Sequence, residues 1–332
     1  MNLKEILIKS RPDSTATTIK SYIRLLHRLK LGDDLTQLSD FDKVLDKIKE
    51  FDVGYLTERN YLNAVIVLMQ GLGVDSTVIE PYQVHRDGLN QRYTDEQSTR
   101  TLSAKQEENW LTMEQLNALL AHMKNEVKSY PVGPLDNNSL RNLQNYFMLS
   151  FWLVYPLRND LSDTVVMTKR VFNALDQDQK INKNYLVTDT KKPFLSLGRY
   201  KTVKTYGIKK ILITDPGVKK AMNRWLRANP LKFALIRIPK SGTDYRPMSS
   251  IGITQTFNRI FMHFYKKKFS TTMFRHVVLT EKFGDNLDEL EKFRSIMGHS
   301  SQTAQTIYVK RRPGEVIMKS IPETSNLGPR NN

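Results

Sequence analysis

The 332-residue sequence contains no cysteine. Disulfide bonds, thiolate zinc sites and cysteine nucleophiles are therefore excluded, and we expect an intracellular protein, in the cytoplasm or nucleus. The first residues, MNLKEILIKSRPDS, lack a continuous apolar core, so we expect no signal peptide. The longest apolar run, 146–157, is too short to cross a bilayer. It predicts a buried helix, and we expect no membrane association.

Acidic residues are few compared with basic ones, at 34 against 51, which gives a net charge of +17. The surplus is unevenly placed along the chain. Residues 1–83 hold 11 basic and 12 acidic side chains, whereas residues 111–332 hold 36 and 17. A surplus of this size indicates a polyanionic partner, and the C-terminal two-thirds of the chain carries the whole surplus.

The pattern of apolar residues divides the chain into four parts. Residues 1–83 show helical periodicity and predict an all-helical domain. Residues 84–109 are polar and poor in apolar side chains, which predicts a linker. Residues 110–313 combine helices with a few short strands and predict a larger domain that is mainly α with a small β-sheet. The tail, 314–332, is loosely patterned and is expected either to be mobile or to contact a neighbouring subunit.

A basic helix face stands out in the first domain. Lys20, Arg24, His27 and Arg28 recur at helical spacing, opposite an apolar face that begins at Ile19. Two interpretations remain open, a solvated charged face or a contact with the DNA backbone.

The stretch RSIMGHSSQTAQTIY, from Arg294 to Tyr308, is the most informative in the chain. Asn286 begins a predicted amphipathic helix that ends at Gly298, and a second helix follows. This places His299 in the turn between them and Tyr308 on the buried side of the second helix. Tyr308 is then either a core residue with a hydrogen-bonded hydroxyl or a nucleophile directed at phosphate.

Three further cations have informative positions. Arg158 follows directly after the buried helix that Pro156 ends. It either points into a site or pairs with a nearby aspartate. Lys201 lies in a basic, turn-rich segment that predicts a β-hairpin, with Lys204 close behind. Arg275 falls within a predicted helix over 271–283.

These residues follow one another as they do in the tyrosine recombinases, or phage-type integrases. MGHSSQTAQTIY resembles that family's Gly-His and Tyr motif, with the nine-residue spacing between His299 and Tyr308. FRHVVLT resembles its Arg-His segment, YPLRNDL its first arginine box, and YKTVK the hairpin that carries its lysine. The resemblance covers about residues 5–312. YPLRNDL and KQEENWLT are most similar to recombinases of large DNA viruses and their virophages.

The resemblance implies a helical core-binding domain, a linker and a catalytic domain over 110–313. It implies that Tyr308 attacks a DNA phosphate to give a 3′-phosphotyrosyl link. Arg158, Arg275 and His299 would stabilise charge on the phosphate oxygens, because guanidinium forks grip two oxygens at once. Lys201 would protonate the leaving sugar oxygen, with Lys204 as the fallback.

Two positions depart from the family pattern. Thr272 stands where the family has a histidine, and its hydroxyl can bond a phosphate oxygen but cannot take up a proton as imidazole does. Leu161 stands where an acidic residue is usual, with Asp160 beside it.

We therefore predict a site-specific DNA recombinase that needs no cofactor, neither metal nor ATP, because the ester to tyrosine conserves the bond energy. Its partners would be double-stranded DNA, contacted by Lys20, Arg24, Arg28 and Lys204, and three further copies of itself in a homotetramer on two sites. The alternatives are a type IB topoisomerase and a DNA-binding protein without catalysis.

Overall fold

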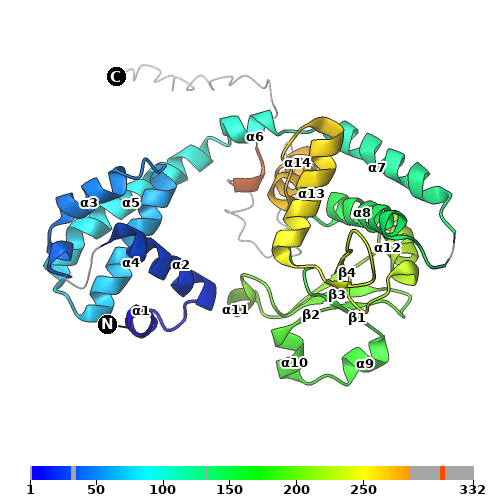
Figure 1. Ribbon diagram of the computed structural model, residues 1–332, viewed down its shortest axis with the longest axis horizontal. Coiled ribbons are helices and arrows are strands. Elements are labelled where there is room, and N and C mark those ends of the chain that lie inside the picture. The colour runs from blue at the N-terminus through cyan, green and yellow to red at the C-terminus, as the bar shows by residue number, and fades with distance from the viewer. Residues whose placement is uncertain (1, 31–34, 132, 284–306, 311–332) are drawn as a thin grey trace, which may run out of the picture. The chain divides into compact units, whose positions relative to one another are not determined.

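The computed structural model describes residues 2–30, 35–131, 133–283 and 307–310, and the chain divides into two compact units between Thr99 and Arg100. Helices dominate both units and a small sheet lies in the second (Figure 1). The predicted fold class, mainly α with a small β-sheet, is confirmed.

The first unit is helical, as predicted. Its elements are α1 Leu3–Ser10, α2 Ala16–Leu29, a 3₁₀ turn over Leu35–Ser39, α3 Phe41–Lys49, α4 Tyr55–Leu72 and α5 Ser76–Ser98. Its core surrounds α4, where Tyr61 to Met69 is almost continuously buried, with Asn63 half-buried. Side-chain oxygens of Thr15 and Asp40 accept the free N–H groups at the starts of α2 and α3.

Helix α5 occupies much of the segment 84–109, where we expected a linker. Only Ile79 and Tyr82 of α5 are buried, both near its start. Further along, Gln91 bonds Asp95 and Arg92 bonds Glu96, each pair one helical turn apart. Such pairs stabilise a helix that buries little apolar surface. The sequence of this segment is polar for that reason, and its composition alone did not indicate a helix.

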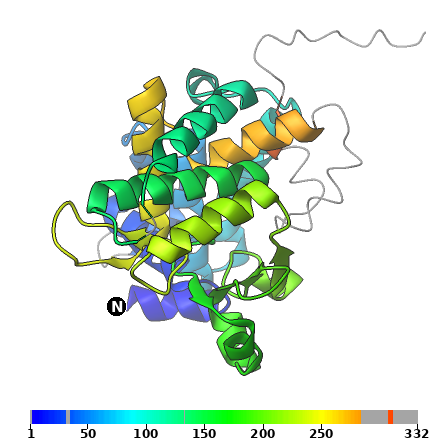
Figure 2. The ribbon, with the colours of Figure 1, turned by 90° about the vertical axis from the view of Figure 1, so that its right-hand side faces the viewer.

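The second unit packs helices against one face of a sheet. Its longer helices are α7 Met113–Lys128, α8 Asn137–Val154, α12 Pro216–Ala228, α13 Ser250–Tyr265 and α14 Thr271–Phe283. Helix α8 includes the predicted buried run as far as Val154, two residues before Pro156, and lies beside α7 and α12 (Figure 2). A capping box formed by Thr112 and Gln115 begins α7.

The sheet has strand order β1-β2-β3-β4, from β1 Val165–Met167, β2 Asn184–Val187, β3 Phe194–Leu197 and β4 Lys209–Leu212. Strands β1 and β2 are parallel, and the other pairs are antiparallel. The short helices α9 Lys169–Asn173 and α10 Gln177–Asn182 lie on the side of the sheet away from α8 (Figure 1). The predicted hairpin is therefore present as β3 and β4, and its connection contains α11 Val203–Tyr206.

Several expectations lie outside the described residues. These are the helix beginning at Asn286, the turn holding His299, and the tail 314–332. Within the described ranges, no helix is long and apolar enough to span a bilayer.

Candidate active site

A cavity of about 550 Å³ in the second unit collects most of the residues that the sequence singled out. Arg158, Lys201, Thr272, Arg275 and Tyr308 all line it. They come from the loop after α8, the β3–β4 connection, α14 and the segment 307–310. We call this cavity the tyrosine pocket.

Arg275 and Tyr308 are in direct contact. The Arg275 guanidinium donates from Nη1 to the Tyr308 hydroxyl at 3.0 Å, and its carbon lies 5.2 Å from the centre of the phenol ring. Both side chains are buried, at 4% and 8% exposed. A tyrosine oxygen is thus held against a fixed positive charge inside the pocket.

Only some of the N–H groups of the Arg275 guanidinium have hydrogen-bond partners among the described residues. Its Nε atom is buried and has no hydrogen-bond partner among the described residues. Burial lowers the pKa of Arg275, with a further contribution from Arg158 nearby, while Tyr308 and Asp160 oppose the shift. An incompletely paired buried cation is unfavourable, so the pocket is suited to receive an anion.

Arg158 lies in the same pocket, which favours the interpretation that it points into a site. Asp163, one of the aspartates near Arg158 in the sequence, pairs with Arg199 at 2.9 Å. The Asp160 carboxyl is close enough to Arg158 for the guanidinium charge to affect its pKa. Burial raises the pKa of the Asp160 carboxyl, and Arg158 and then Arg275 oppose that rise.

A hydrogen-bond network fixes the backbone beside Arg158. Asn159 accepts from the Thr271 hydroxyl at 2.8 Å and donates to the Ser250 carbonyl at 2.9 Å and the Thr254 hydroxyl at 3.0 Å. The loop after α8 is thereby joined to the first turns of α13 and α14. Because Thr271 lies one turn before Arg275, the same network sets the spacing of the two arginines.

Hydrogen bonds also fix the backbone at and after Tyr308. His276 contacts the Tyr308 carbonyl through Nδ1 at 3.3 Å and the Gln106 amide nitrogen through Nε2 at 3.0 Å. A carbonyl only accepts, so Nδ1 carries the hydrogen and Nε2 accepts from Gln106. Gln106 also closes the capping box of α6, Ala104–Glu108. Thr280 and Arg100 bond the neighbouring backbone at Lys310 and Val309.

Burial lowers the pKa of His276 to about 4, so the ring is neutral near pH 7. In the unfolded chain a histidine takes up its proton near pH 6.5. The neutral ring therefore stabilises the fold above that pH, and the contribution is lost as the pH falls from 6.5 towards 4.

We expect the unfolding free energy of the wild type to fall by about 2 kcal/mol more than that of His276→Asn between pH 7 and pH 5. Asparagine is chosen because its amide can still donate to the Tyr308 carbonyl. Denaturant unfolding of both proteins at the two pH values measures the difference. If the difference in unfolding free energy between the two proteins is the same at pH 7 and pH 5, the His276 ring is not buried in its neutral form.

Three lysines lie in or near the β3–β4 connection. Lys201 lines the pocket and is exposed. Lys204, the fallback, is exposed on α11 and does not line the pocket. Lys209, at the start of β4, was not singled out from the sequence. Burial lowers the pKa of its amine and Arg158 lowers it further, with Asp160 opposing. A lowered pKa makes an amine a readier proton donor. Lys209 does not line the pocket among the described residues, but its charge interacts with Arg158 and Asp160, which do, so Lys209 is the alternative to be tested for that role.

Thr272 is exposed in the first turn of α14 and lines the pocket, three residues before Arg275. Its hydroxyl is therefore available at the place expected from the sequence. Arg199 also lines the pocket and was missed, because nothing in its sequence neighbourhood distinguishes it from other surface arginines.

The basic face of α2 belongs to the first unit. Lys20, Arg24 and Arg28 are exposed there, and Arg28 lies 4.5 Å from the centre of the Phe51 ring. Their place on the surface is compatible with both interpretations of that face. His299 lies outside the described residues. Within those residues, no three His, Asp or Glu side chains gather closely enough to hold a metal ion.

No family model matches the sequence, and no curated protein matches it. The structure is similar to the crystal structure of XerA recombinase, with 12% identity and a TM-score of 0.38 over 93% of this chain and 94% of that one. It is also similar to XerH site-specific recombinase bound to difH substrate in a pre-cleavage complex. There the identity is 13% and the TM-score 0.44, over 94% of this chain and 91% of that one.

Proposed function

We propose that this protein is a tyrosine recombinase that cleaves and rejoins DNA at specific sites through a covalent link to Tyr308. The observation that carries the proposal is the Tyr308 hydroxyl, held 3.0 Å from Arg275 Nη1 in a pocket that Arg158 and Lys201 also line. A phenol, two guanidiniums and an amine are the groups that such a transesterification requires.

In the proposed reaction the Tyr308 oxygen attacks phosphorus and gives up its proton to solvent water. Negative charge grows on the two non-bridging oxygens, where Arg158 and Arg275 donate hydrogen bonds. The bond to the 5′ oxygen breaks, and Lys201 gives that oxygen a proton. One P–O bond replaces another, so the 3′-phosphotyrosyl link conserves the energy needed for rejoining.

Strand exchange by this route requires four cuts, two in each of two duplexes. With one Tyr308 per chain, four subunits supply the four nucleophiles. We therefore extend the proposal to a homotetramer on two DNA sites, which would integrate or excise a viral or other mobile element.

Two DNA substrates test the proposed function. A pool of nicked duplexes traps the covalent complex when the fragment beyond the cut diffuses away, and a supercoiled plasmid reports relaxation. A recombinase forms adducts that share a sequence and joins two duplexes that carry it. A topoisomerase relaxes any plasmid, and a protein that only binds DNA forms no adduct.

Lys201→Ala is expected to slow cleavage about a hundredfold, because the leaving oxygen loses its proton donor. Replacing the bridging 5′ oxygen with sulfur should restore the rate, since a thiolate leaves without a proton. The rate of adduct formation on both substrates is the measurement. Lys210→Ala is the matched control, since Lys210 is exposed on β4 and lies 4.3 Å from the centre of the Phe194 ring. If sulfur rescues Lys209→Ala but not Lys201→Ala, Lys209 is the donor and the assignment to Lys201 is wrong.

A further inference from the structure

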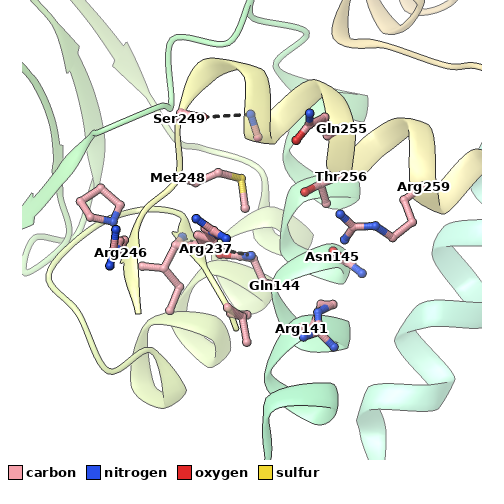
Figure 3. A pocket seen from close by; sticks show the side chains of 14 residues that line it. Arg141, Gln144, Asn145, Arg237, Arg246, Met248, Ser249, Gln255, Thr256 and Arg259 are labelled. Atoms are coloured by element: carbon pink, nitrogen blue, oxygen red, sulfur yellow. Dashed lines mark hydrogen bonds between the residues drawn. The ribbon is translucent and has the colours of Figure 1, made fainter. Parts of the chain in front are cut away.

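A second cavity, also in the second unit, is lined by four arginines. It measures about 460 Å³ and lies between α8, α13 and the hairpin of β5 Ile236–Arg237 and β6 Arg246–Pro247 (Figure 3). The four side chains come from all of these elements and are Arg141, Arg237, Arg246 and Arg259. Among the described residues, no aspartate or glutamate lines this cavity, which we call the arginine pocket.

Two of the four arginines have partners in the fold. Arg141 donates to the Pro239 carbonyl at 3.1 Å, and Arg246 pairs with Asp244 at 2.9 Å. The side chains of Arg237 and Arg259 are exposed, and no hydrogen bond or ion pair joins either guanidinium to the described part of the chain. Their guanidinium donors are therefore available to a ligand.

A buried amide adds to the polar lining. The Oδ1 atom of Asn145 is buried and accepts no hydrogen bond among the described residues. Figure 3 shows the Asn145 side chain beside Arg259, between α8 and α13. Rotating the amide by half a turn would present its NH₂ group at that place, and a donor there would complement the two arginines.

The arginine pocket is separate from the tyrosine pocket. Ser250 and Thr254 of α13 line the tyrosine pocket, whereas Gly252, Gln255 and Arg259 line the arginine pocket. At about 100° per residue these two sets lie on opposite faces of the helix. A helix is about 10 Å thick with its side chains, so one phosphate cannot occupy both pockets.

We propose that the arginine pocket binds a second phosphate-class anion, held by the guanidinium groups of Arg237 and Arg259. Guanidinium forks fit the paired oxygens of a phosphate, and the absence of a lining carboxylate leaves their charge for the ligand. Such a phosphate comes either from the DNA backbone or from a free phosphate compound. The proposal goes beyond strand cleavage and does not require Tyr308 to be a nucleophile.

Calorimetric titration of the full chain with inorganic pyrophosphate tests the anion site. Pyrophosphate should bind the wild type and bind the double variant Arg237→Gln/Arg259→Gln about tenfold or more weakly, because two charged donors are lost. Arg227→Gln is the matched control, an exposed arginine of α12 outside both pockets, and should bind as the wild type does.

The salt dependence of duplex binding identifies the source of the phosphate. Each lost DNA phosphate contact lowers the slope of log K against log salt by about 0.9. A slope reduced by about one to two in the double variant, but not in Arg227→Gln, assigns the pocket to the DNA backbone. Weaker pyrophosphate binding with an unchanged slope assigns it to a free anion. The proposal is overturned if the double variant matches Arg227→Gln both in its affinity for pyrophosphate and in the salt slope of duplex binding. Neither measurement involves cleavage, so this result is independent of the proposed function.

Discussion

Tyr308→Phe should form no covalent adduct with DNA while keeping nearly all of its affinity for the duplex. The substitution removes one oxygen and leaves the ring, which lies 5.5 Å from the His276 ring between their centres. Without that oxygen no bond to phosphorus can form, so the loss is complete. Duplex affinity depends on many other basic contacts and should hardly change.

The control for this prediction is Tyr206→Phe. Tyr206 is an exposed tyrosine of α11, in the same unit, and does not line the tyrosine pocket. Adduct formation on the nicked pool and retardation on an intact duplex are measured for both variants. If Tyr308→Phe forms the adduct with the wild-type yield, the nucleophile is a residue other than Tyr308.

Arg275→Met should slow adduct formation by about 10² to 10³, the usual effect of losing one donor to the transition state. Methionine is close in volume and apolar, so it suits a position that is only 4% exposed. A buried cation with an unsatisfied Nε opposes folding. The variant should therefore be as stable as the wild type, or more stable.

Arg224→Met serves as the comparison, because we expect it to change stability and not the cleavage rate. Arg224 donates to the backbone carbonyls of Val127 and Tyr130 and does not line the tyrosine pocket. Its loss should lower thermal stability and leave the cleavage rate of the folded protein unchanged. If Arg275→Met instead unfolds at lower temperature and cleaves at the normal rate, Arg275 is a structural residue.

The sequence predicted the helices and strands that carry the tyrosine pocket. Helix α14 has the expected bounds, Thr271–Phe283, and the paired strands β3 and β4 frame Lys201 as expected. Periodicity was sufficient here because each element buries one face or pairs with its neighbour in the chain. The order of Arg158, Lys201, Arg275 and Tyr308 also suggested their common site, and the structure brings all four to one pocket.

The supporting contacts were not predictable from the sequence. Gln106 bonds His276 across 170 positions, and Thr271 bonds Asn159 across 112. Neither pair has a local pattern, because a side chain that bonds a distant partner leaves no periodic signal. The low pKa of His276 likewise follows from burial, which only the packing of the chain defines. For the same reason the arginine pocket, assembled from three separate parts of the chain, could not be recognised in advance.

Mass spectrometry of the DNA-linked peptide tests the central claim most directly. The trapped complex is digested with protease and nuclease, and the residue that carries the nucleotide is located by fragmentation. We predict a 3′-phosphonucleotide on the Tyr308 oxygen and a free 5′-hydroxyl on the released strand. A nucleotide on any other residue, or a link to the 5′ end of the cut, would contradict the account.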